Sequence, residues 1–313
     1  MTEASFNNLT SFIRTEWSRS VPPEVETAAQ AIVSKYGDSV TGVIFYGSCL
    51  RTGEIIDKVL DFYVIVDSYR AAYDGRMLAL ANKILPPNVF YHEIEVAGVT
   101  VRSKYAVLSL EDLKFRTSEH CLNVSVWARF CQPCMLLAAK DDNGTSEIAE
   151  AVAAAVATMF KNFLDLEPSL LESRALWVGA FEQTYAAELR SERSGKGLEI
   201  YLLDQDRYDR LTPVALAALG IDQKPETIRH QPTRMQRWRP RLRWTTRRWN
   251  GKIVSFLRLV KATATFDGGI DYLAWKISRH SGVEVEIKDW MRKHPVIAGV
   301  SLFWSLRKEG AFK

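Results

Sequence analysis

The chain has 313 residues, 47% of them hydrophobic and 25% charged, and a formal net charge of +4. This composition excludes a disordered chain, and the length suits two domains better than one. No run of about 18 apolar residues occurs, so we expect no membrane-spanning segment, and residues 1–20 lack the apolar core of a secretory signal.

The first half of the chain alternates between helical and strand patterns. The expected helices cover 21–36, 70–84 and 110–130, and the expected strands cover 43–46, 60–66, 89–96, 99–108 and 135–138. Alternating elements of this kind predict an α/β domain.

The second half is helical in pattern, with expected helices at 145–163, 168–190 and 195–220. The loop signal Asp141-Asp142-Asn143-Gly144 marks a boundary between the two halves. We therefore expect a mixed sheet with flanking helices over residues 1–142 and a mainly helical domain over 143–313.

The four cysteines include Cys131 and Cys134 in a CxxC arrangement, which is compatible with a redox pair or half of a metal site. No second CxxC is present. We favour buried thiols in a reducing compartment.

Gly47-Ser48 ends one apolar run, and Asp61 lies near the head of the next. A glycine lets the backbone approach a triphosphate, whose oxygens accept from N–H groups and a serine hydroxyl. A carboxylate on the neighbouring strand would hold a divalent cation against the same phosphates. This layout is typical of polymerase-β-type nucleotidyltransferases, although a turn followed by an ordinary strand aspartate would look the same.

A second carboxylate is expected two residues after the first, because alternate strand residues share a face. Tyr63 occupies that position, and Asp67 is roughly 20 Å away along an extended strand. Glu93 and Glu95, on another expected strand, are the alternative metal ligands, and the sequence does not choose between them.

Four elements in order resemble the mitochondrial translocator-assembly-and-maintenance type of phosphatidate cytidylyltransferase, which has bacterial relatives. They are Phe45-Tyr46-Gly47-Ser48, the segment from Asp61-Phe62 to Val66-Asp67, Lys104-Tyr105-Ala106-Val107, and Ala128-Arg129-Phe130-Cys131-Gln132-Pro133. A looser match over 257–269 includes Arg258 and Lys261. Cys49-Leu50 and Ala128 depart from the family pattern, and residues 200–250 match poorly.

The resemblance implies a polymerase-β-type fold and an enzyme that makes CDP-diacylglycerol and diphosphate from CTP and phosphatidic acid with Mg²⁺ or another divalent cation. It places Tyr46, Gly47, Ser48 and Lys261 at the nucleotide, and Asp61 at the metal. Lys104 and Arg129 would surround the triphosphate. It also implies a peripheral protein on the cytoplasmic side of the inner membrane, or the matrix side in mitochondria.

Arginines alternate with Trp238, Trp244 and Trp249 in the basic stretch 229–252. Such a stretch fits an anionic membrane surface, a nucleic acid, or a solvated loop with buried tryptophans. We favour the membrane and expect no nucleic-acid partner. The amphipathic tail Trp290–Lys313 fits either an interfacial or a core-packed helix.

Three rival functions remain at this stage: transfer to another acceptor, a catalytically dead fold that binds nucleotide or membrane, and RNA binding through the basic stretch.

Overall fold

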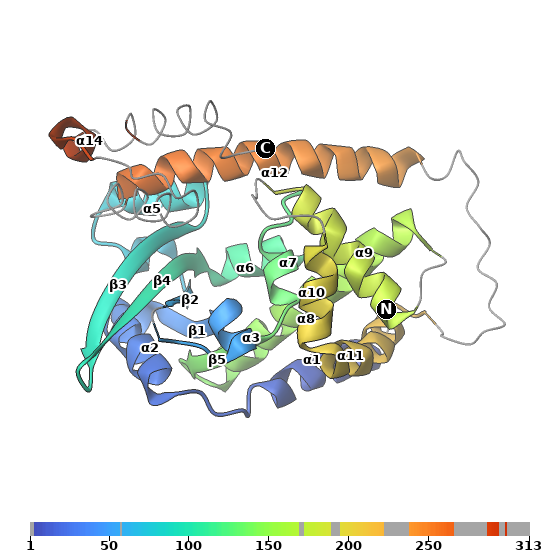
Figure 1. The fold of residues 1–313 in the computed structure, drawn as a ribbon. Helices are drawn as coiled ribbons and strands as arrows, with labels where there is room; N and C mark the ends of the chain where they lie inside the picture. The colour runs from blue at the N-terminus through green and yellow to red at the C-terminus, as the bar shows by residue number, and fades with distance from the viewer. Residues whose placement is uncertain are drawn as a thin grey trace.

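A mixed five-stranded sheet, ordered β3-β4-β2-β1-β5, organises the first half of the chain (Figure 1). The computed structural model describes residues 3–56, 58–168, 172–188, 195–221, 238–265, 287–293 and 298. β2 and β4 are parallel, and the other neighbours are antiparallel. The strands are β1 Val40–Tyr46, β2 Val59–Val66, β3 Asn88–Val96, β4 Val99–Ser109 and β5 Cys134–Ala139.

Helices flank the sheet and form most of the second half, so the expected α/β class with a helical region is confirmed. In the first half they are α1 Glu3–Glu16, α2 Pro23–Tyr36, α3 Ser48–Thr52, α4 Tyr69–Ala72, α5 Arg76–Ile84, α6 Leu110–Thr117 and α7 Trp127–Phe130. In the second half they are α8 Asp142–Leu166, α9 Ser173–Ala186, α10 Lys196–Leu203, α11 Gln205–Ala218, α12 Trp238–Thr265 and α14 Asp289–Lys293.

The two faces of the sheet belong to two hydrophobic clusters, because successive strand residues point to opposite sides. Phe45 and Phe62 pack with α2 on one face. Ile44, Tyr63 and Ala106 pack on the other face with the apolar side chains of α7, α8 and α9. The sheet therefore shares one core with the helical half.

The expected helix 110–130 is wrong in its middle, where residues 118–126 are not helical. Asn123 Oδ1 accepts hydrogen bonds from the backbone N–H of Ser125 at 3.2 Å and from its hydroxyl at 2.5 Å. Such local side-chain bonds compete with helical ones. The expected helix 70–84 is likewise divided at Tyr73–Gly75 into α4 and α5.

The CxxC cysteines are free, buried thiols. Cys131 Sγ contacts the carbonyl of Ala155 at 3.3 Å, and burial raises the pKa of Cys134 to about 12. Both cysteines belong to the hydrophobic core on the helical side of the sheet. The described residues contain no group of three potential metal ligands.

The basic stretch, where it is described, belongs to α12, which runs along the top of the molecule (Figure 1). Trp244 and Arg247 are buried, whereas Trp238 and Trp249 are exposed. Arg247 donates to the carbonyls of Cys121 and Leu122 at 2.8 and 2.9 Å and to Asn162 Oδ1 at 2.9 Å. Residues 229–237 and most of the C-terminal tail lie outside the described residues.

We expect Arg247→Ala to lower the free energy of unfolding by about 3 kcal/mol, because it leaves two buried acceptors and one partly buried acceptor without their donor. Arg248→Ala is the matched control, since that neighbouring arginine is exposed and its hydrogen bond among the described residues is to Gln183. Urea unfolding measures both variants. Equal losses would contradict the structural role of Arg247.

Candidate active site

The Gly47-Ser48 turn lies at the C-terminal end of β1 and begins α3. Gly47 has φ +95°, a backbone conformation that residues other than glycine rarely adopt. A Cβ atom there would lie 2.6 Å from Oδ2 of Asp61. Both the positive φ and the close approach to Asp61 therefore require glycine at position 47. The neighbouring Ser48 is exposed.

Asp61 lies in one row across four strands, formed by Tyr46, Asp61, Lys104 and Tyr91. Its side chain is 15% exposed, and Oδ1 forms an ion pair with Lys104 Nζ at 3.0 Å. The sheet register thus brings together the Gly–Ser turn, the carboxylate and the lysine that the sequence predicted separately.

Tyr63, where a second carboxylate was expected, is 2% exposed. Its ring packs against those of Tyr46 and Phe130, each with centroids 5.1 Å away. The hydrophobic core begins at this position, so a carboxylate there would be buried in an aromatic cluster.

The structure does not bring the other candidate carboxylates to Asp61. Glu93 pairs with Arg102 at 3.2 Å, and Glu95 accepts from Thr100 at 2.5 Å. The register separates Glu93 from Asp61 by two strands and two residues, about 12 Å between Cα atoms. Asp67 lies at the far end of β2, where Lys140 and Thr41 each donate to it at 2.8 Å.

Asp61 is therefore the carboxylate at this turn in the described part of the chain. Mg²⁺ is commonly bound by one or two carboxylates together with substrate phosphates. The residues fit a cation that arrives with a nucleotide, and they do not form a three-carboxylate cage.

Arg129 in α7 faces the same end of the sheet. Burial opposes its charge, but the surrounding groups, first Glu188 and then Tyr63, Tyr46 and Asp61, together outweigh burial and raise the pKa of the guanidinium. Glu188 lies 3.6 Å from Nη1, which also donates to the carbonyl of Ser125. The Arg129 side chain is 29% exposed, and Glu188, which is 6% exposed, is its anionic partner.

Two further cations come from α12. Arg258 donates to the hydroxyl of Ser125 at 2.7 Å and to the carbonyl of Pro86 at 2.8 Å. Lys261 donates to the carbonyl of Pro87 and to Asn88 Oδ1, both at 2.8 Å. Burial, followed by the charge of Arg258, lowers the pKa of Lys261 to about 7.

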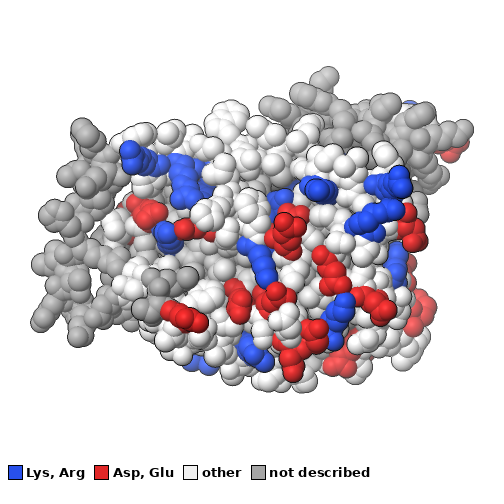
Figure 2. Space-filling model, turned by 180° about the vertical axis from the view of Figure 1, so that it is seen from behind, with Lys and Arg blue, Asp and Glu red and all other residues white. Residues whose placement is uncertain are grey.

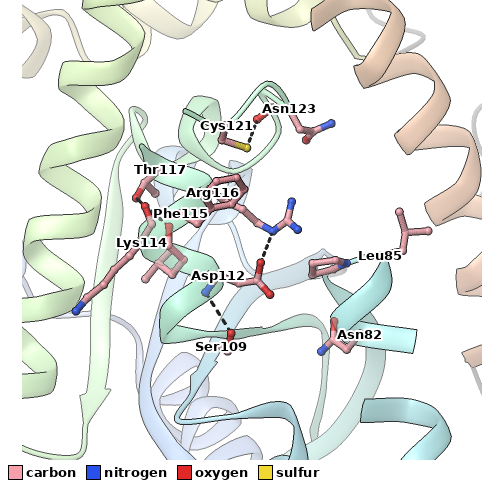
Figure 3. A network of polar contacts seen from close by, with 12 residues as sticks. Asn82, Leu85, Ser109, Asp112, Lys114, Phe115, Arg116, Thr117, Cys121 and Asn123 are labelled. Atoms are coloured by element: carbon pink, nitrogen blue, oxygen red, sulfur yellow. Dashed lines mark hydrogen bonds and ion pairs between the residues drawn. The ribbon is translucent and has the colours of Figure 1, made fainter. Parts of the chain in front are cut away.

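Arg116 of α6 completes this group and points toward the side of Leu85 (Figure 3). Asp112 accepts its Nε–H at 3.0 Å. Its positive charge also acts on Arg258 and Lys261. We call Arg116, Arg129, Arg258 and Lys261 the cation cluster; Asp112 and Glu188 are its nearby carboxylates.

The cation cluster carries more positive than negative charge, and Nη2 of Arg258 is buried with no hydrogen-bond partner among the described residues. Burial lowers the pKa of Arg258 to about 10. Buried, incompletely paired guanidinium groups favour an anionic ligand. By contrast, the face seen from behind shows interspersed acidic and basic side chains (Figure 2).

A cavity of about 130 Å³ lies elsewhere, between α3, the start of β5 and the end of α10, with Arg51, Cys134 and Asp204 in its lining. Neither Asp61 nor Lys104 lines it. The candidate site is therefore identified by its charged residues and not by this cavity.

Sequence reasoning missed Arg116, Ser125 and Glu188. Arg116 follows Asp112 by four residues, which reads as an ordinary helix ion pair. Glu188 follows the end of α9 and carries no motif. Only the packing of α6, α7, α9 and α12 makes these residues neighbours.

No family model and no curated protein matches the chain. A nucleotidyltransferase-like protein from Exiguobacterium sibiricum is a structural match over 91% of this chain and 92% of its own, with 11% identity and a TM-score of 0.28. A similarity of this extent assigns no function to the chain.

We expect Gly47→Ala to destabilise the protein more than Gly53→Ala. Both glycines have positive φ, but a Cβ at Gly53 meets nothing within 4 Å, whereas one at Gly47 meets Asp61. In the control, Gly53→Ala, backbone strain alone should lower the free energy of unfolding by about 1 kcal/mol. Thermal unfolding compares them, and equal losses would contradict the close approach of Gly47 to Asp61.

Lys261 predicts a pH dependence of stability. An unfolded lysine keeps its proton to about pH 10, whereas the folded pKa is about 7. Between these values the unfolded chain binds the extra proton, so the contribution of this lysine to the free energy of unfolding increases with pH. Urea unfolding of Lys261→Met should show a shallower increase than the parent. The exposed Lys252→Met is the control, and an unaltered slope in Lys261→Met would refute the lowered pKa.

Proposed function

We propose that the protein is a nucleotidyltransferase of the phosphatidate cytidylyltransferase type, which converts CTP and phosphatidic acid into CDP-diacylglycerol and diphosphate. The observation that carries the proposal is an open Gly–Ser turn beside Asp61 and Lys104, with Arg129 of the cation cluster near Asp61. The sequence resemblance adds the choice of CTP and of a lipid phosphate.

The chemistry demands that two anions meet. An oxygen of the acceptor phosphate attacks the α-phosphorus of CTP, the bond to the β-phosphate oxygen breaks, and its electron pair leaves with diphosphate. The acceptor is mostly dianionic at neutral pH, because its second pKa is about 6, so it needs no general base. Positive charge around both phosphates is the main requirement.

The residues divide between these two anions. Gly47 leaves room for the triphosphate, Ser48 donates to its oxygens, and Lys104 and Arg129 neutralise it. Asp61 would hold the Mg²⁺ that accompanies the nucleotide, which stabilises charge on the phosphates. Arg258, Arg116 and Lys261, farther along the cation cluster, would receive the acceptor phosphate.

The assay is diphosphate release with CTP, Mg²⁺ and phosphatidic acid in mixed micelles. Reactions without lipid, or with ATP, GTP or UTP in place of CTP, identify the acceptor and the base. Release that requires both CTP and lipid supports the proposal. Release without lipid would indicate another acceptor, and no release with any nucleotide would overturn the proposed activity.

We expect Asp61→Asn to reduce turnover at least about a hundredfold, because it removes the carboxylate at the phosphates. Asp67→Asn is the matched control, since Asp67 directly follows β2 at the end away from the turn, and it should keep its turnover. Unfolding is measured in parallel to establish that both variants fold. Retained turnover in Asp61→Asn would contradict the assigned role.

A further inference from the structure

The outer face of α12 carries a stripe of exposed, large apolar side chains. Five residues of one helix share this property: Trp238, Leu242, Trp249, Ile253 and Leu257, which are 51%, 55%, 68%, 55% and 45% exposed. Their separations of four, seven, four and four residues place them in one sector of the helix. We call this sector the outer stripe.

The opposite face of α12 is fixed to the body of the protein. Trp244 Nε1 donates to the carbonyl of Asn162 at 3.1 Å, and Arg247 is fully buried. Gly251 packs so closely on Ala187 that a Cβ atom would overlap the backbone there. The outer stripe is therefore held facing outward, where a helix of a water-soluble protein normally has polar residues.

The charge of α12 has a single sign. Residues 238–265 contain six arginines, two lysines and no acidic residue. Arg239, Arg241, Arg248 and Lys252 are exposed around the stripe. A surface of this kind repels a second copy of itself and attracts a negatively charged partner.

We propose that the outer stripe docks the protein on an anionic bilayer, with α12 lying parallel to the membrane surface. Tryptophan is favoured at the headgroup level, aliphatic side chains enter the acyl boundary, and each nearby base contributes about 1 kcal/mol. A single-stranded nucleic acid would require stacking surfaces, and Leu242, Ile253 and Leu257 provide none. The aliphatic half of the stripe therefore favours lipid over RNA.

This docking deepens the proposed function, on which its catalytic consequence rests. Ile253 and Leu257 face outward from the same part of α12 that directs Arg258 and Lys261 inward to the cation cluster. A helix is about 10–12 Å across, side chains included. Docking would thus bring the cation cluster within about one helix diameter of the lipid headgroups.

Co-sedimentation with vesicles tests the docking without any nucleotide. The vesicles are phosphatidylcholine, with and without about a quarter phosphatidylglycerol, which supplies the anionic charge. The parent protein should sediment with the anionic vesicles and less with neutral ones. The double variant Trp249→Ser/Ile253→Ser should bind them about tenfold more weakly or worse, because it removes two inserting side chains.

Leu202→Ser is the matched control, since Leu202 on α10 is 54% exposed, like Leu242, but lies on another helix. It should bind as the parent does. Equal binding of the double variant and the parent, or tighter binding of the parent to a single-stranded RNA than to anionic vesicles, would overturn the membrane assignment.

Diphosphate release separates this proposal from the proposed function. With phosphatidic acid dispersed in detergent, the double variant should turn over as the parent does, and with vesicles it should turn over more slowly. Loss of vesicle binding is scored whether or not the parent shows turnover. Failure of the activity therefore leaves the docking result interpretable.

Discussion

The arrangement of the helical half depends on buried arginines, whose guanidinium groups must donate hydrogen bonds to protein oxygens. A buried charge without such partners costs several kcal/mol. Arg207 meets Glu16 at 2.6 Å and so joins α11 to α1, while Arg247 joins α12 to α8 and to the loop after α6. Arg129 meets Glu188 beyond α9. These contacts fix where the helices lie on the sheet, and Arg258 is left incompletely paired next to them.

The sheet imposes a second constraint, because one strand must serve both core and site. On β2, Asp61 and Tyr63 share a face, yet the first is partly exposed and the second is enclosed by Tyr46 and Phe130. The boundary of the core passes between them. A second carboxylate at position 63 would face rings instead of water, so the site relies on one carboxylate and several cations.

Local pattern and strand pairing account for Gly47, Asp61 and Lys104, whereas Arg129, Arg258 and Lys261 were identified from the family resemblance and lie on α7 and α12. The strands and the turn at Gly47 follow from local pattern, whereas the adjacency of Asp61 and Lys104 depends on the parallel pairing of β2 with β4, which β3 separates in the sequence. Glu188, Ser125 and Arg116 could not be found in this way, since helix packing over long sequence separations brings them together. The basic stretch was ambiguous for a related reason: its composition does not tell which arginines are buried, and only the orientation of α12 separates Arg247 from Arg248.

The net charge of the chain is small, but its basic residues are unevenly distributed, and this distribution suits the proposed function. Within the described residues, α12 directs some of its bases into the cation cluster and others outward around an apolar stripe. Burial, and after it the charges of the neighbouring bases, lower the pKa values of Arg258 and Lys261. An anion bound there would relieve this repulsion and stabilise the folded state by mass action. The same helix would then couple two events that a lipid-directed transferase needs, contact with an anionic surface and capture of one phosphate from it.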